Sequence, residues 1–114
     1  AAIEFRINAE NPDLGFFPSP GTVTGLHLPG GPGVRVDTAL YAGCAVPPFY
    51  DSLVAKLVVW GCDRQEALAR GRRALDELRI EGIATTRSFQ RALADEPRFV
   101  GGRYDTAYVE EVGW

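Results

Sequence analysis

Several features that would point directly to a function are missing from this sequence. Its 114 residues contain no Met, one His and two Cys. The cysteines, Cys44 and Cys62, form neither a CxxC pair nor a disulfide framework, so we expect reduced thiols and no metal site. No run approaches the ~20 apolar residues needed to cross a bilayer, and no signal peptide is visible. We therefore expect a cytoplasmic protein without a membrane partner.

Positive charge is also in short supply. Lys and Arg total 12 against 15 Asp and Glu, a net charge of −3, which argues against a nucleic-acid partner. Three arginines do cluster at Arg70, Arg72 and Arg73, but Asp76 and Glu77 accompany them, so a solvated helix face is the expected interpretation. The length and the 46% hydrophobic content are those of one globular domain.

No complete catalytic motif is present. The sequence has neither a Walker-type glycine loop nor HExxH. The glycine-rich segment 29–33 lacks the GxGxxG order and predicts a simple turn. The single histidine, His27, lies in a strand-like segment, where a surface or structural role is expected.

The first half of the chain alternates with period two. Ile3, Phe5 and Ile7 share one face of a predicted strand over 3–8. Further extended segments are expected at 22–28, 34–38 and 40–46, and the apolar segment 53–60 predicts a central strand covered on both faces. Lys56 within it needs a counter-charge or a route to solvent. Because strand patterning begins at Ile3 without a preceding turn, we expect the chain to be a piece of a longer protein.

The pattern then changes to the 3.6-residue period of helices. The spacing predicts an amphipathic helix over 64–79, which Asp63 and Glu66 begin as a capping box, and in which Gly71 requires close packing. Thr86 is predicted to cap a second helix over 87–95, and a final strand or turn is expected at 104–109. Strands first and helices later predict an α+β fold, with an antiparallel, curved or barrel-like sheet followed and backed by two helices.

Two groups of polar residues could carry chemistry. Glu4, Arg6 and Asn8 project from one face of the first strand, where a guanidinium oriented by its neighbours could bind a carboxylate or bicarbonate, or stabilise an oxyanion. A plain solvent-facing strand explains the same pattern. Asp51 follows two prolines in a rigid loop, where it could either hold another side chain or cap a turn.

Five segments, in this order, give the sequence a family resemblance: AIEFRINAE at 2–10, FPSPG at 17–21, PGGPGVRVD at 29–37, VPPFYDSLVAKL at 46–57 and RALDELRIEG at 73–82. Together they resemble the C-terminal domain of biotin carboxylase, the subunit or domain found in acetyl-CoA carboxylase and related acyl-CoA and pyruvate carboxylases. The resemblance spans roughly residues 2–110, so residues 1–114 are expected to form that one domain.

The resemblance implies a function for the intact enzyme. That enzyme uses ATP and Mg2+ or Mn2+ to activate bicarbonate and then carboxylates biotin on a carrier protein. The ATP-grasp domain, which supplies the nucleotide and metal site, is not in this sequence, so we expect no activity from this chain alone. The implied partners are the ATP-grasp domain, the biotin carrier, a carboxyltransferase and a second copy in a homodimer.

The resemblance also assigns roles to individual residues. Arg6 matches an arginine that stabilises the biotin enolate and contacts bicarbonate. Asp51, with Glu4, would support it, and Arg35 matches an arginine at the dimer interface, although an ordinary surface salt bridge is the alternative. Ala1, where the family usually has His, and Cys44, where an aromatic residue is common, depart from the pattern. The competing interpretations are a non-catalytic binding module of the same fold and the corresponding domain of an ATP-grasp ligase acting on purine precursors.

Overall fold

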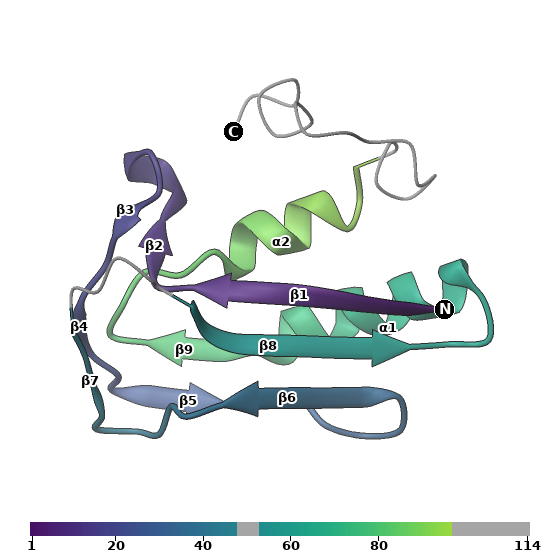
Figure 1. Cartoon of the computed structure of the whole chain (residues 1–114), viewed down its shortest axis with the longest axis horizontal. Coiled ribbons are helices and arrows are strands. Elements are labelled where there is room, and N and C mark those ends of the chain that lie inside the picture. Colours follow the sequence, from purple (N-terminus) through teal and green to yellow (C-terminus); the bar gives the residue numbers. More distant parts are fainter. Residues whose placement is uncertain (48–52, 97–114) are drawn as a thin grey trace.

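The computed structural model describes residues 1–47 and 53–96. A three-stranded antiparallel sheet, in the order β1-β8-β6, is its centre (Figure 1). It consists of β1 (Ala2–Asn8), β8 (Leu53–Trp60) and β6 (Val34–Thr38). The central position predicted for the 53–60 strand is therefore confirmed. The register of β1 on β8 shifts between Ile7 and Asn8, where the strand ends.

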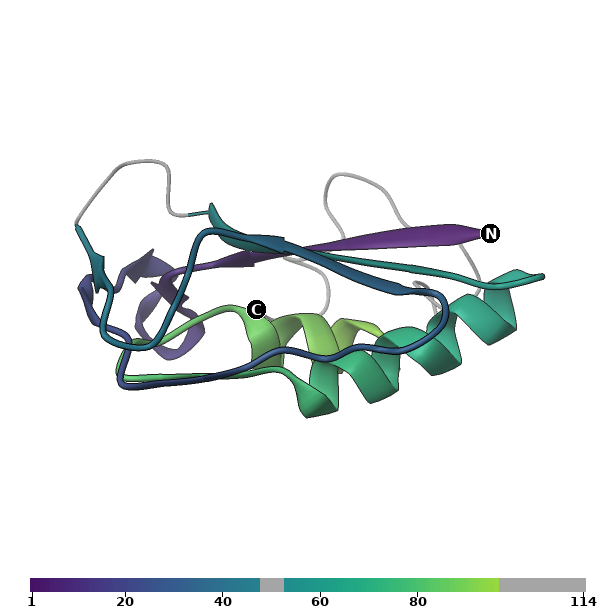
Figure 2. The same cartoon turned by 90° about the horizontal axis from the view of Figure 1, so that it is seen from below.

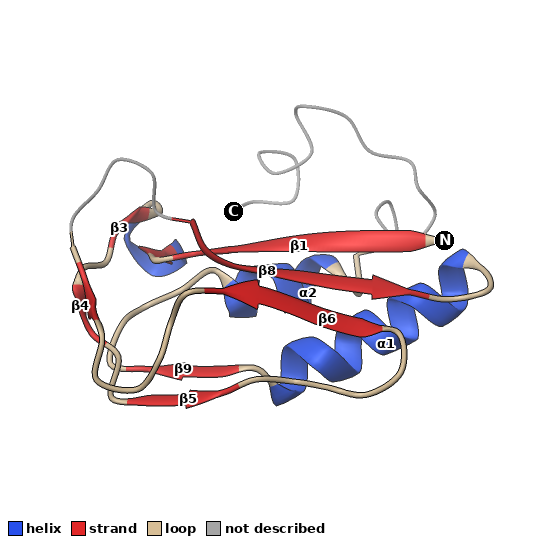
Figure 3. Ribbon diagram, turned by 60° about the horizontal axis from the view of Figure 1, so that its bottom comes forward, coloured by secondary structure: helices blue, strands red, loops and turns tan. Residues whose placement is uncertain are grey.

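Two helices cover one face of this sheet, as Figures 2 and 3 show. Helix α1 (Arg64–Glu77) packs on β8 and β1, and α2 (Arg87–Leu93) packs on α1 and β1. The molecule is only 18 Å across its shortest axis, which leaves room for one sheet and one layer of helices. The predicted α+β fold with an antiparallel sheet backed by two helices is confirmed.

The hydrophobic core lies between the sheet and the helices. Phe5, Ile7 and Leu57 are almost completely buried there, as their alternation in the sequence requires. The remaining core residues come from the same strands, from α1 and from the segments after the helices: Ile3, Ala55, Val59, Ala67, Leu68, Ala74, Leu75, Leu78 and Ala94. Along β8 only every second side chain is buried, so the expectation that this strand is covered on both faces is wrong for the described residues.

Helix α1 begins as the sequence predicts. The Asp63 carboxylate accepts a hydrogen bond from the Glu66 backbone N–H at 2.8 Å. The Glu66 carboxylate, however, accepts from the N–H of Cys62 rather than from that of Asp63 (3.2 Å). The helix ends at Glu77, two residues earlier than predicted, because Leu78 is already extended and leads into β9 (Arg79–Glu81).

Helix α2 begins differently from the prediction. The Thr86 hydroxyl makes no cap bond to its own helix. It accepts instead from the backbone N–H of Asn8 at 2.9 Å, while the Thr86 N–H donates to the Asn8 carbonyl at 3.0 Å. These reciprocal bonds tie the start of α2 to the end of β1. The helix ends at Leu93, not at residue 95 as expected.

Three two-stranded antiparallel ladders complete the described structure. They are β2 (Glu10–Asn11) with β3 (Phe17–Pro18), β4 (Gly21–Thr22) with β7 (Ala45–Val46), and β5 (Gly25–His27) with β9. The short η1 helix (Pro12–Leu14) connects β2 to β3. Beyond it, Phe16 packs edge-to-face on Phe89 of α2, with ring centroids 5.1 Å apart.

Two strand predictions need correction. The expected strand over 22–28 is interrupted at Val23 and Thr24, because the N–H of Val23 bonds to Cys44 whereas that of Thr24 bonds to Glu81. The chain changes partner strands there. The expected extended segment over 40–46 is mostly a turn, with Gly43 at φ +95°, and only Ala45–Val46 pair as a strand. The predicted element at 104–109 lies outside the described residues.

Candidate functional site

The face of the three-stranded sheet that the helices leave uncovered carries most of the candidate site residues. We call it the outer face. In Figure 2 it is the side of the sheet turned away from α1 and α2. Its side chains alternate with those of the core along each strand. They are Glu4 and Arg6 on β1, Val54, Lys56 and Val58 on β8, and Arg35 and Asp37 on β6.

Strand register sets which of these residues are neighbours. Arg6 pairs with Lys56 across the β1–β8 ladder, and Lys56 pairs with Asp37 across the β8–β6 ladder. Directly opposite side chains in antiparallel strands have Cβ atoms about 5 Å apart. The structure thus brings together a row of two cations and one anion contributed by three strands.

The backbone of Arg6 is fixed by its neighbours, whereas its guanidinium has no partner in the described structure. Its neighbours Phe5 and Ile7 are buried, and its carbonyl accepts a hydrogen bond from the Gln90 side chain of α2 at 3.2 Å. Within the described part of the chain, the Arg6 guanidinium makes no hydrogen bond or ion pair. A guanidinium in that state can bind an external oxyanion with its planar fork.

In the described structure, neither flanking residue on β1 makes a hydrogen bond or ion pair with the Arg6 side chain. Asn8 donates its side-chain amide to Glu10 at 3.1 Å. Glu4 is exposed, and its cross-strand neighbour is Val58. The supporting role predicted for Glu4 stays a prediction, as does that of Asp51, which lies outside the described residues.

Arg35 and Asp37 form a two-bond ion pair at the other edge of the sheet. The Arg35 Nε and Nη2 atoms donate to the two Asp37 carboxylate oxygens at 3.0 and 2.7 Å. The hydrogen bond from Arg35 holds the pKa of Asp37 below its ordinary value, helped by the positive charges of Arg35 and Lys56. The same pair raises the pKa of Arg35. Both side chains are exposed, so the predicted interface role of Arg35 stays open beside this salt bridge.

Asp37 and Lys56 are the residues that sequence reasoning missed or left undefined. Asp37 stands two positions after Arg35, so period two alone places both side chains on one face of β6. The position of Lys56 between Arg6 and Asp37 depends on strand register, for which the sequence offers no comparable signal. The counter-charge that the sequence predicts for Lys56 is partly supplied by Asp37, whose negative charge lies beside it.

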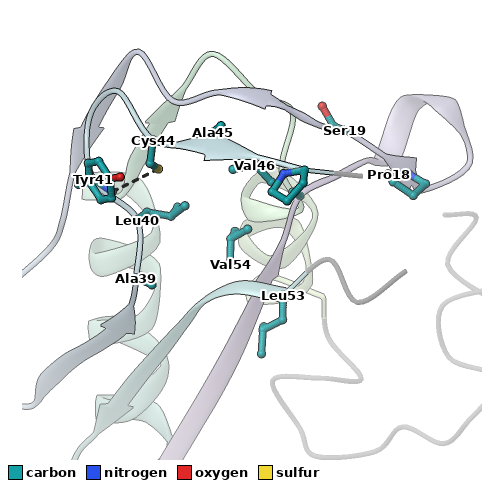
Figure 4. Close-up of a pocket in the computed structure, with 12 residues that line it drawn as sticks. Pro18, Ser19, Ala39, Leu40, Tyr41, Cys44, Ala45, Val46, Leu53 and Val54 are labelled. Atoms are coloured by element: carbon teal, nitrogen blue, oxygen red, sulfur yellow. Dashed lines mark hydrogen bonds between the residues drawn. The ribbon is translucent and has the colours of Figure 1, made fainter. Parts of the chain in front are cut away.

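An open cavity of about 290 Å³ lies beside β7, at the end of the sheet where β1 and β6 finish and β8 begins (Figure 4). Two of its polar groups already have partners within the chain. The Cys44 Sγ accepts from the Tyr41 N–H at 3.4 Å, and the Ser19 hydroxyl accepts from the Ala84 N–H at 3.0 Å. The rest of the lining is mostly apolar, with Leu40 and Val54 directed toward the space. The described lining of this cavity therefore carries no charged side chain.

The other candidate groups are explained by structure. Arg70, Arg72 and Arg73 are paired with acids, which agrees with the predicted solvated helix face. The 29–33 segment is a turn that enters β6, a strand, and so lacks the helix start of a phosphate cradle. Among residues 1–47 and 53–96, no group of three His, Cys, Asp or Glu side chains could hold a metal, and no helix is long and apolar enough to span a bilayer.

Comparison with known proteins gives one consistent result. The family model described as biotin carboxylase C-terminal domain matches residues 4–111. The chain is 49% identical to a biotin carboxylase from Nostoc over 97% of its own length, and 51% identical to biotin carboxylase 1 from Bacillus subtilis over 96%. It covers only 25% and 24% of those two proteins, so it spans about a quarter of their length.

Solved structures agree with the sequence comparison. The biotin carboxylase domain dimer of the Hydrogenobacter thermophilus 2-oxoglutarate carboxylase, solved with MgADP, ADP and bicarbonate, superimposes with a TM-score of 0.93 at 43% identity. The match covers 96% of this chain and 24% of that one. With the family model, the relatives and the fold in agreement over nearly every residue, this chain belongs to the biotin carboxylase C-terminal domain family.

Proposed function

We propose that this domain is part of an ATP-dependent biotin carboxylase and that it supplies Arg6 to the site where biotin is carboxylated. The observation that carries the proposal is the state of Arg6: a guanidinium without a partner among the described residues, on a strand fixed by the core and by α2. The family resemblance supports it, since Arg6 lies in the EFRINAE segment.

The carboxylation of biotin requires a group that stabilises negative charge, and such a guanidinium can provide it. The ureido nitrogen of biotin is a poor nucleophile until its proton leaves, and negative charge then develops on the ureido oxygen. A fixed cation that donates two hydrogen bonds lowers the energy of that enolate-like state. Preorganisation matters here, because a donor whose backbone is already held in place loses little entropy when it binds the developing charge.

This domain would not supply the nucleotide chemistry. The described residues contain no phosphate cradle and no cluster of metal ligands. ATP and its Mg2+ or Mn2+ would bind to the ATP-grasp domain of the complete enzyme, and biotin would arrive on a carrier protein. A carboxyltransferase and a homodimeric partner, with Arg35 at the interface, complete the proposed assembly, which we place in the cytoplasm.

The test uses the complete carboxylase chain that contains this domain. Bicarbonate-dependent ATP hydrolysis and carboxylation of free biotin are measured for the parent enzyme, for Arg6→Ala and for Arg6→Lys. We expect Arg6→Ala to lower kcat for biotin carboxylation by about 10²–10³, the usual cost of losing one preorganised donor. Arg6→Lys keeps the positive charge but not the guanidinium that donates two hydrogen bonds. Its kcat should therefore lie between those of the parent and Arg6→Ala.

A matched control removes an arginine from the helix layer. Arg73 pairs with Glu77 on α1, on the covered side of the sheet, and Arg73→Ala should leave turnover within about twofold of the parent. The 114-residue chain alone should hydrolyse no ATP. Unchanged biotin-dependent turnover in Arg6→Ala would refute the catalytic role and favour a purely structural domain.

A further inference from the structure

The outer face holds two cations side by side. Arg6 and Lys56 are directly opposite each other in the β1–β8 ladder. Like charges in that position destabilise an antiparallel pair unless something else compensates for their repulsion. Since neither the fold nor the core requires a charge at either position, this arrangement needs another explanation.

The nearest acid on this face is already occupied. Asp37 is the other cross-strand neighbour of Lys56, but both of its carboxylate oxygens accept hydrogen bonds from Arg35. Within the described ranges, no carboxylate lies within ion-pair distance of Lys56 or Arg6. Four arginines of the two helices differ in this respect. Those at positions 70, 72, 73 and 91 each pair with an Asp or Glu.

The surroundings of Lys56 suit a small anion. Its side chain is half-buried, and Val54 and Val58 flank it on the same face of β8. An open recess of about 390 Å³ lies beside it, and Asp37 and Thr38 form part of the lining. The chain as a whole is acidic, yet the outer face carries three cations against two carboxylates.

We propose that Lys56 is a second anion-binding residue of the Arg6 site and that the two cations together bind bicarbonate. This inference rests on the proposed function. Arg6 would provide the directional hydrogen bonds, and Lys56 would add a charge that raises the affinity for the oxyanion. The substrate would in turn relieve the repulsion between the two side chains, so substrate binding would also stabilise the sheet.

The experiment compares Michaelis constants in the complete carboxylase. We expect Lys56→Met to raise KM for bicarbonate about tenfold, the effect of removing one charge a few Å from the anion. KM for ATP and for free biotin should change less than about twofold. Lys56→Arg keeps the charge and should restore bicarbonate KM to within about threefold of the parent. Arg73→Met, which removes the same charge from the helix layer, should leave all three constants unchanged.

Added variants separate the possible failures. Unchanged bicarbonate KM in Lys56→Met, together with strongly impaired turnover in Arg6→Ala, would overturn this inference and leave the proposed function intact. If Arg6→Ala has no effect, the proposed function itself fails. Should Lys56→Met not fold, Asp37→Asn provides a test of opposite sign, because loss of the neighbouring negative charge should lower bicarbonate KM severalfold. A rise in that constant would contradict the proposal.

Discussion

At the scale of single residues, the outer face is organised by charge rather than by packing. Arg35 and Asp37 satisfy each other through two hydrogen bonds, while Arg6 and Lys56 have no such partner in the described structure. An exposed ion pair adds little stability, since water and salt screen it. Its greater effect is to engage both carboxylate oxygens of Asp37, so that this acid forms no ion pair with Lys56.

The ion pair predicts a measurable titration of Asp37. Its lowered pKa means that folding favours the ionised carboxylate. The sign follows by linkage: the contribution to stability is complete above the ordinary pKa of 3.8 and is lost as the pH falls through the lower folded value. An NMR titration of the Asp37 carboxyl carbon should therefore have its midpoint below 3.8.

Replacing the partner should reverse this shift. Arg35→Gln removes the main hydrogen-bond donor, so the Asp37 midpoint should move back toward 3.8, whereas Arg73→Gln on the other layer should leave it in place. A midpoint that does not respond to Arg35→Gln would mean that another group, such as Lys56, causes the shift.

The sequence predicted those site positions that depend on alternation within a single strand. Period two placed Glu4 and Arg6 on the polar face of β1, and the structure has them there. It could not place Lys56 beside Arg6, because these residues lie far apart in the chain and meet only through the β1–β8 register. The same limit applies to the Thr86 hydroxyl: a local cap was the natural expectation, but the N–H of Asn8, 78 positions away, is its actual donor.

At the scale of secondary-structure elements, the contact between α1 and β1 determines how firmly the Arg6 strand is held. Gly71 allows the close approach that its position in the middle of a helix suggested. A Cβ atom at this position would lie 2.8 Å from Cε2 of Phe5 and 3.0 Å from its Cζ. Phe5 directly precedes Arg6, so this packing fixes the backbone beside the candidate site.

Gly71→Ala should consequently destabilise the domain. Alanine favours a helix over glycine by up to ~1 kcal/mol, but the clash with the buried Phe5 ring should cost more, for a net loss of about 1–3 kcal/mol. Urea unfolding of the 114-residue chain measures this difference. Gly30→Ala is the control, because a Cβ there meets open space. An increase in stability for Gly71→Ala would show that the two elements can separate without penalty.

At the scale of the whole molecule, the described helices pack on one face of the sheet and leave its other face without helix cover. The sheet and a single layer of helices make up its 18 Å thickness. The antiparallel arrangement was predictable because strands precede helices in the sequence. The outer face was not, since the apolar segment 53–60 suggested burial on both sides. Val54 and Val58 are only half-buried in this chain, which spans about a quarter of its relatives' length.

Adjacent residues of β8 should therefore respond very differently to truncation. Leu57 is fully buried in the core, so Leu57→Ala should cost about 2–5 kcal/mol of unfolding free energy. Val58 points to the outer face, and Val58→Ala should cost less than about 1 kcal/mol. Chemical denaturation of both variants tests the assignment of faces, and equal losses would contradict it.

The strict alternation along β8 also constrains how this domain can change over evolution. Substitutions can adjust the outer face independently of the core, because each side chain belongs to one side only. A one-residue insertion or deletion within the strand would instead exchange the two sides, placing Lys56 among the core residues and Leu57 in water. We therefore expect the length of this strand to be its most conserved property, since a constant length keeps the core side chains on one face and the charged side chains on the other.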